Sequence, residues 1–158
     1  MSMGSRTRVR SFPRRDRRMG QALVEFALVI PMFLLLLFII IEGGRFILYY
    51  ETLNNATREG ARHAIVNGAN SFDCTGPPAP AATGPCDPTG ADVIARVRSA
   101  AFGVLGNGVV VTPTWHDPAD NGRGSTVTVT ATYTYTSIIP VPLPAITVSA
   151  ESSLVINN

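Results

Sequence analysis

The sequence predicts an α+β protein: a long N-terminal transmembrane helix that extends into a small extracytoplasmic domain with one short helix and about three antiparallel strands. Three observations support this prediction. Every residue from Phe26 to Ile41 is apolar, an amphipathic pattern continues the helix beyond that run, and the C-terminal third alternates apolar with polar side chains. Helical patterns followed by a run of strand patterns are typical of the α+β class.

The apolar run is long enough to anchor the chain in a membrane. Ala22 to Ile41 is twenty residues with a single charge, Glu25. A helix of this length covers roughly 30 Å, the thickness of the hydrocarbon core. The apolar part of a cleaved secretory signal is shorter, about 7–15 residues, and Glu42–Phe46 offers no small-residue cleavage site. We therefore expect an anchor rather than a removed signal.

The charge distribution predicts the orientation of this anchor. Seven of the thirteen basic residues precede Gly20 and only Asp16 opposes them, which gives this head a net charge of +6. Basic residues beside an apolar run stay on the cytoplasmic side. The usual motifs of nucleic-acid-binding modules do not occur, so we expect membrane lipid and no nucleic acid as the partner of the head. The predicted segments are a basic cytoplasmic leader (1–20), a transmembrane and extended amphipathic helix (21–68) and an extracytoplasmic α+β domain (69–158).

The amphipathic part of the helix carries an apolar stripe that ends in residues with small side chains. Its apolar positions recur at steps of three and four residues: Phe46, Tyr50, Leu53, Ala56, Gly60 and Ala64. Small residues let another element approach closely, and this element could belong to the same domain or to a neighbouring subunit. On the polar face, Arg58 and Arg62 are like-charged and four residues apart, which disfavours the helix unless a carboxylate elsewhere pairs with them.

The remaining elements follow a loop that is rich in proline. We expect a short helix over 89–102 with Thr89 as its N-cap, and strands over 109–115, 125–136 and 145–156. In the second strand every even position is threonine, whereas Val127, Val129 and Ala131 lie on the other face. This alternation predicts a half-buried antiparallel strand with a solvated threonine face.

The two cysteines, Cys74 and Cys86, lie in the proline-rich loop beyond the membrane run. An extracytoplasmic compartment is oxidising, so we predict a disulfide between them. Closing a loop of this size contributes on the order of 3 kcal/mol to stability in the chain-entropy model.

No catalytic constellation is apparent. The two histidines, His63 and His116, do not have zinc-ligand spacing, and neither a phosphate-binding loop nor a nucleophile elbow occurs. Asp117–Gly122 lacks the glutamate that closes a calcium loop and is interpreted as a turn. We expect neither an enzyme nor a bound metal or cofactor.

The segment Gly20–Phe26 is the most distinctive motif, because it places Glu25 near the start of an apolar helix. A carboxylate inside a membrane segment is a functional candidate, although at the interface its cost is small. A glycine followed by an apolar helix with glutamate at the fifth position resembles a type IV prepilin processing site. Gly20–Pro31, together with Ala56–Arg62, resembles TadE-like proteins of the tight-adherence pilus system.

The resemblance implies a minor pilin or pseudopilin in the bacterial cytoplasmic (inner) membrane. A prepilin peptidase would cut it after Gly20, and other pilin-like subunits would be its partners in pilus assembly, adhesion or secretion. The resemblance implies two groups of site residues: a processing site of Gly20, Gln21, Glu25 and Phe26, and an assembly motif of Arg58, Glu59, Gly60 and Arg62.

One alternative function remains open at this point. A surface-anchored binding module would use its β-rich domain for recognition, with the threonine face, Trp115, Tyr133 and Tyr135 as its surface. The same aromatic residues would serve equally well in a core. Processing distinguishes the two functions, because a receptor of this kind keeps its basic head.

Overall fold

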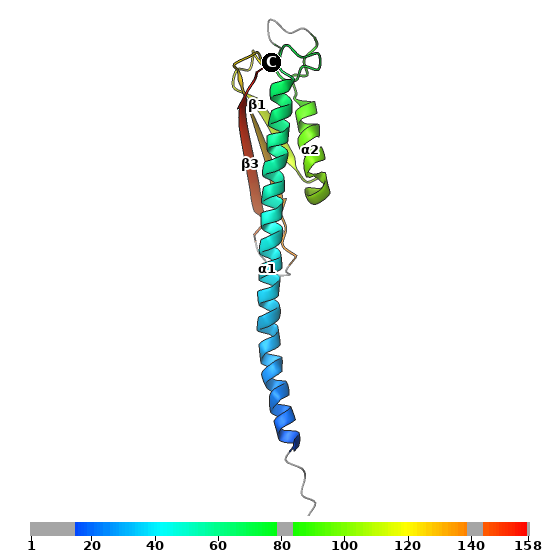
Figure 1. The fold of residues 1–158 in the computed structure, drawn as a ribbon, viewed down its shortest axis with the longest axis vertical. Helices are drawn as coiled ribbons and strands as arrows, with labels where there is room; N and C mark the ends of the chain where they lie inside the picture. The colour runs from blue at the N-terminus through cyan, green and yellow to red at the C-terminus, as the bar shows by residue number, and fades with distance from the viewer. Residues whose placement is uncertain (1–14, 79–83, 139–143, 158) are drawn as a thin grey trace, which may run out of the picture. The chain divides into compact units, whose positions relative to one another are not determined.

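A computed structural model describes residues 15–78, 84–138 and 144–157. In chain order, its elements are α1 (Arg15–Val66), α2 (Ala91–Leu105), β1 (Val110–Trp115), β2 (Thr126–Tyr135) and β3 (Ile146–Val155) (Figure 1). A long N-terminal apolar helix, a short helix and an antiparallel sheet confirm the predicted α+β class. Most of the predicted basic leader lies outside the described residues.

The chain divides into two compact units, Met1–Ile41 and Glu42–Asn158, and the division falls within α1. The segments predicted from the sequence (1–20, 21–68 and 69–158) have different boundaries, because they were defined by the expected membrane crossing. They remain a prediction. We describe the two units separately.

The first unit contains the apolar stretch of α1. Within the described residues, α1 is the one helix long and apolar enough to cross a membrane, and none of its most apolar window is buried. Its leucine, isoleucine and phenylalanine side chains are exposed all around the helix. A contiguous apolar surface of this size is unfavourable in water, whereas lipid would cover it without cost.

In the second unit the strands form a sheet of order β1-β2-β3. Both pairs are antiparallel, with Val110 opposite Thr132 and Tyr135 opposite Ile146. Val127 and Val129 of β2 are fully buried, whereas Thr126, Thr128 and Thr130, which alternate with them, are partly exposed, which confirms the predicted alternation. Pro113 lies in the edge strand β1, where a residue that cannot donate a ladder hydrogen bond is tolerated.

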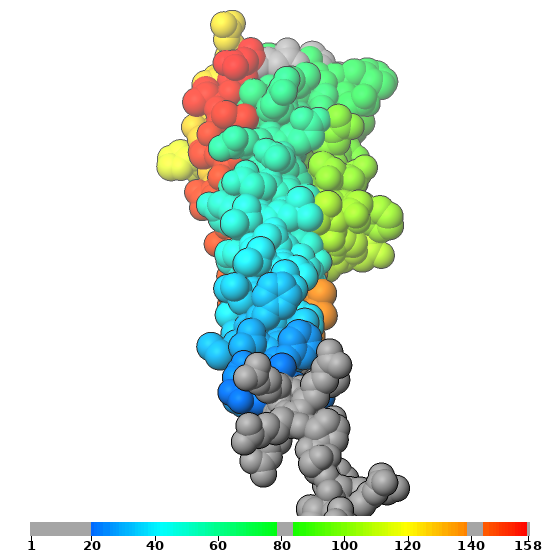
Figure 2. Space-filling view, turned by 60° about the horizontal axis from the view of Figure 1, so that its bottom comes forward, coloured from blue at the N-terminus to red at the C-terminus, as the bar shows by residue number. Residues whose placement is uncertain are grey.

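The core of this unit lies between the sheet and the two helices. The C-terminal part of α1 is flanked by α2 on one side and β3 on the other (Figures 1 and 2). The buried cluster joins residues from every element, including Leu53, Ala64, Val93, Val129 and Ile156. Most of the apolar stripe of α1 therefore packs on the chain's own domain, whereas Tyr50 is 45% exposed and Tyr49 packs against the core in its place.

The closest approach between the helices is at Gly60. A Cβ atom added to Gly60 would lie 2.2 Å from Cγ2 of Val97, which is itself fully buried in α2. Ala56, Ala61 and Ala64 are buried on the same stretch of α1. The small residues recognised in the sequence thus allow α2 of the same chain to approach α1 closely.

We expect Gly60→Ala to lower the free energy of unfolding by roughly 1–3 kcal/mol, because the stiff Val97 side chain leaves no space for a methyl group. Gly44→Ala is the matched control, since nothing lies within 4 Å of its added Cβ. That control should gain roughly 0.5–1 kcal/mol of helix propensity. Urea unfolding of the full chain in detergent, followed by the fluorescence of the single tryptophan, Trp115, measures both.

A double-mutant cycle with Val97→Ala provides a further control. Shortening Val97 should reduce the cost of Gly60→Ala, because the clashing methyl group is then absent. A Gly60→Ala variant as stable as the wild type would contradict the close contact.

Candidate functional site

The predicted processing segment lies within α1, where Gly20, Gln21, Glu25 and Phe26 are all exposed. The side chain of Gln21 donates a hydrogen bond from Nε2 to Oε1 of Glu25 at 3.1 Å. This bond spans four residues, so the carboxylate lies one helical turn from residue 21. No atom outside the local helix lies within 4 Å of a Cβ added to Gly20, which leaves this position open.

The predicted assembly motif is divided between the core and the surface. Gly60 is buried against α2, whereas Arg58 and Arg62 are exposed. Glu59 accepts hydrogen bonds from Nη2 and Nε of Arg96 in α2, at 2.6 and 3.1 Å. The sequence suggested a carboxylate partner for Arg58 and Arg62, but within the described residues neither forms a salt bridge. The pair that forms instead joins Glu59 to a helix 37 residues further along the chain.

An open groove of about 360 Å³ lies beside this ion pair. It is lined by residues of α1, of the turn that follows α1 and of α2: Glu59, Arg62, His63, Val66, Asn67 and Arg96. The hydrogen bond from Arg96 lowers the pKa of Glu59, and the charge of Arg62 lowers it further. The lining carries both signs of charge beside the apolar side chain of Val66.

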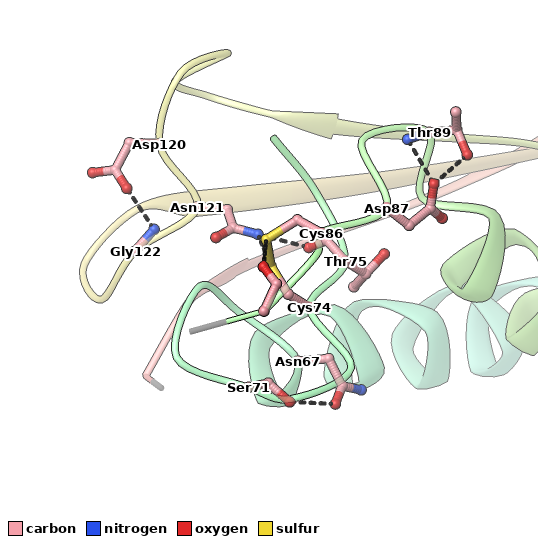
Figure 3. Close-up of a disulfide and its surroundings, with 11 residues drawn as sticks. Asn67, Ser71, Cys74, Thr75, Cys86, Asp87, Thr89, Asp120, Asn121 and Gly122 are labelled. Atoms are coloured by element: carbon pink, nitrogen blue, oxygen red, sulfur yellow. Dashed lines mark hydrogen bonds between the residues drawn. A yellow bond between two sulfur atoms is a disulfide. The ribbon is translucent and has the colours of Figure 1, made fainter. Parts of the chain in front are cut away.

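The predicted disulfide between Cys74 and Cys86 is confirmed, with their Cα atoms 4.4 Å apart. The loop ends are also tied through the backbone, since the amide of Asp87 donates to the carbonyl of Cys74 at 2.9 Å. Asn121, which is fully buried, donates from Nδ2 to the carbonyl of Thr75 at 2.8 Å (Figure 3). The disulfide loop is therefore attached to the turn that precedes β2.

The start of α2 differs from the prediction. Thr89 was expected to cap this helix, but the N-cap is Gly90, which has a φ of 65° and no side chain that could accept a hydrogen bond. The carboxylate of Asp87 instead accepts hydrogen bonds from the amide and the hydroxyl of Thr89 (Figure 3). It also accepts one from the amide of Ala91. Thr89 is thus a donor to the capping group. These hydrogen bonds, led by that of the Thr89 side chain, lower the pKa of Asp87.

The aromatic residues of the alternative binding surface are engaged in packing. Tyr135 is 5% exposed and belongs to the core, while Tyr133 and Trp115 are partly buried against it. The ring of Tyr49 on α1 makes edge-to-face contacts with both tyrosines, with centroids 5.6 and 5.5 Å apart. A Cβ atom on Gly90 would lie 2.7 Å from the Trp115 ring. These contacts favour the core interpretation of all three residues.

Sequence reasoning missed a cluster around Glu42, the first residue of the second unit. Glu42 pairs with Arg45 at 3.2 Å, and Arg45 donates to the hydroxyl of Tyr49 at 3.1 Å. The hydroxyl of Tyr135 donates to the backbone carbonyl of Glu42 at 3.3 Å. Burial, and secondarily the nearby Glu42, raises the pKa of Tyr135 to about 12. The spacing of Glu42, Arg45 and Tyr49 could have suggested part of the cluster, but nothing local identifies Tyr135.

No metal centre accompanies these sites in the part of the chain that the structure describes, where no group of three His, Cys, Asp or Glu side chains could hold an ion. His63 lies in the groove beside Asn67, and His116 is exposed after β1.

The fold and these segments define a class: a protein with one exposed N-terminal apolar helix whose C-terminal part completes the core of a small α+β domain. Residues 20–62 match the family described as TadE-like protein, which includes both motifs recognised in the sequence. The matched segment is thus similar to TadE-like proteins, and the match does not extend to the rest of the chain. No curated protein and no solved structure matched the chain.

We expect Asp87→Ala to lower the free energy of unfolding by about 1 kcal/mol near neutral pH, because the start of α2 loses its capping carboxylate. The folded-state pKa of Asp87 is depressed, so its contribution is present above the unfolded value of about 3.9 and is lost as pH falls through the folded value. The difference between variant and wild type should therefore shrink below about pH 4. Urea unfolding in detergent across this pH range provides the measurement.

Asp92→Ala is the matched control, since Asp92 is exposed in the first turn of the same helix. It should cost only a few tenths of a kcal/mol through the helix dipole. Equal effects of the two substitutions would show that Asp87 acts by charge alone and not by capping.

Proposed function

We propose that this protein is a membrane-anchored, pilin-like component, a minor pilin or pseudopilin, of a tight-adherence type pilus assembly or secretion system. The observation that carries the proposal is the single helix α1. It carries the Gly20–Glu25 motif near its start, followed by an exposed apolar stretch, and its C-terminal part lies in the core of the α+β domain. The TadE-like match over residues 20–62 covers this same helix. Such a component has a structural rather than a catalytic role.

The proposed topology is a single crossing of the bacterial inner membrane by Ala22–Ile41, with the basic leader in the cytoplasm. The excess of arginine before Gly20 supports this orientation. The disulfide supports an extracytoplasmic location for the domain, since such bonds persist in oxidising compartments. Membrane lipid, a prepilin peptidase and other pilin-like subunits are the proposed partners.

The proposed role of Glu25 follows from processing. Cleavage after Gly20 would give Gln21 a free amine, which is normally protonated near neutral pH. An unpaired charge in an apolar environment is strongly disfavoured, and pairing offsets that cost. The contact between the side chains of residues 21 and 25 supports an internal pair. In an assembled fibre the carboxylate would instead meet the amine of an adjacent subunit and set the axial stagger.

The exposed half of the assembly motif provides a second contact in this proposal. Arg62 lines the groove and Arg58 is exposed one helical turn before it, whereas Gly60 packs against α2. We assign the two arginines to contacts with neighbouring subunits, and Gly60 to the domain's own core.

Processing is tested on the protein isolated from membranes. We expect its N-terminus to be Gln21, and we expect Gly20→Leu to retain the basic leader because the residue before the cut is altered. Gly43→Ala, a glycine substitution further along the same helix, is the control and should be processed normally. N-terminal sequencing and intact-mass measurement report both. A wild-type chain that keeps its leader would favour the alternative, a surface-anchored binding module.

We expect Glu25→Gln to insert and to be processed normally, because it removes a charge from an apolar segment and leaves Gly20 unchanged. Its incorporation should fall, since the protonated amine of the adjacent subunit would lose its partner. The measurement is recovery of the variant with sheared pili or partner subunits, beside an immunoblot for the processed form. Glu51→Gln, exposed on the same helix, is the control. Normal incorporation of Glu25→Gln would show that Glu25 has no role in assembly and only lies at the membrane interface.

A further inference from the structure

One end of the sheet carries exposed apolar side chains beside Glu42. Ile146, at the start of β3, is 47% exposed and lies directly opposite Tyr135 in the sheet register. Ile138, three residues beyond Tyr135, is 66% exposed. Both belong to the α+β unit, and neither is required for its core.

Glu42 fixes this end of the sheet to one point of α1. The hydroxyl of Tyr135 donates to the carbonyl of Glu42 at 3.3 Å, and the amide of Ile138 donates to the Glu42 carboxylate at 3.2 Å. Glu42 directly follows Ile41, the last residue of the apolar run. If Ala22–Ile41 spans the bilayer, the residue that holds Tyr135 and Ile138 lies at the membrane boundary.

The chemistry of this end matches a lipid interface. The sequence from Ser137 to Ala150 contains no charged residue. Tyr49, which is half-buried, combines an apolar ring with a polar tip, as side chains at the headgroup level do. Arg45 lies over the rings of Tyr49 and Tyr135, with its guanidinium carbon 5.4 and 5.6 Å from their centroids, and pairs with Glu42. The pair brings no net charge to the surface.

We propose that this end of the α+β unit rests on the outer leaflet of the membrane, with the side chains of Ile138 and Ile146 in contact with lipid. The proposal rests on the membrane anchoring proposed above and adds a second lipid contact, made by the folded domain itself. Lipid is favoured as the occupant because Glu42, which holds Ile138, directly follows the apolar run in the chain. This contact would limit the tilt of the domain while the protein is anchored in the membrane, before it joins an assembly.

Site-directed fluorescence in vesicles tests the proposal. The disulfide occupies both native cysteines, so an introduced cysteine is the only free thiol. The full chain carries a bimane label at Ile146→Cys and is reconstituted at low density in phosphatidylcholine vesicles containing a headgroup spin-labelled lipid. We expect the quencher to remove roughly half of the emission, as for a side chain within the headgroup region. Ile138→Cys should respond in the same way.

Val155→Cys is the matched control, because Val155 is 50% exposed at the opposite end of the same strand. Nine residues of strand place it about 30 Å away, so its label should lose little emission. Leu35→Cys reports the anchor itself, through quenching by a spin label on the acyl chain.

Quenching at Leu35 without quenching at Ile146 and Ile138 would overturn the lipid contact and leave the anchor intact. Absence of quenching at Leu35 would overturn both. A third outcome is a label at Ile146 whose emission is blue-shifted but not quenched, with a shift that disappears on dilution into excess lipid. That result would assign this surface to a second copy of the chain and would also overturn the proposal.

Discussion

The contact between Gly60 and Val97 is the constraint on which the rest of the α+β unit depends. α1 is apolar on all sides in its first part, whereas its C-terminal part has to bury only one stripe. A Cβ atom at residue 60 would lie 2.2 Å from Val97, so the helices can be this close only where α1 has no side chain. Their proximity brings Glu59 within reach of Arg96 and places Leu53 in the core shared with the sheet. A bulkier stripe on α1 would separate the helices and open the core.

Features that depend on local periodicity could be predicted from the sequence. The threonine–valine alternation of β2 indicated its buried face, and the apolar run indicated the first part of α1. Strand bounds agreed to within a residue or so, because proline and glycine clusters delimit the strands. The Cys74–Cys86 disulfide was also predictable, because these are the two cysteines of the sequence and the expected extracytoplasmic compartment is oxidising.

Features that depend on how the elements pack could not be predicted in the same way. Asp87 caps α2 because the loop turns back through Gly90, whereas a threonine next to the helix was the obvious candidate from sequence. Glu59 pairs with Arg96, and Tyr135 with Glu42, across long separations in the chain. No local pattern specifies such partners, because they follow from the approach of α1 to α2 and to β2. The candidate site was thus predictable as a segment of helix but not as a set of contacts.

The burial of Ile156 has a consequence for how the protein matures. In the proposed topology the chain crosses the membrane starting from α1, and β3 crosses after every other element. The core contains Leu53 and Ala64 from α1, but also Val148 and Ile156 from β3 and the residue after it. Until β3 arrives, the apolar stripe of α1 is uncovered, and contacts this distant in sequence form slowly. In this topology the domain closes only after β3 has crossed, and the intermediate with an uncovered stripe is the state most prone to aggregate.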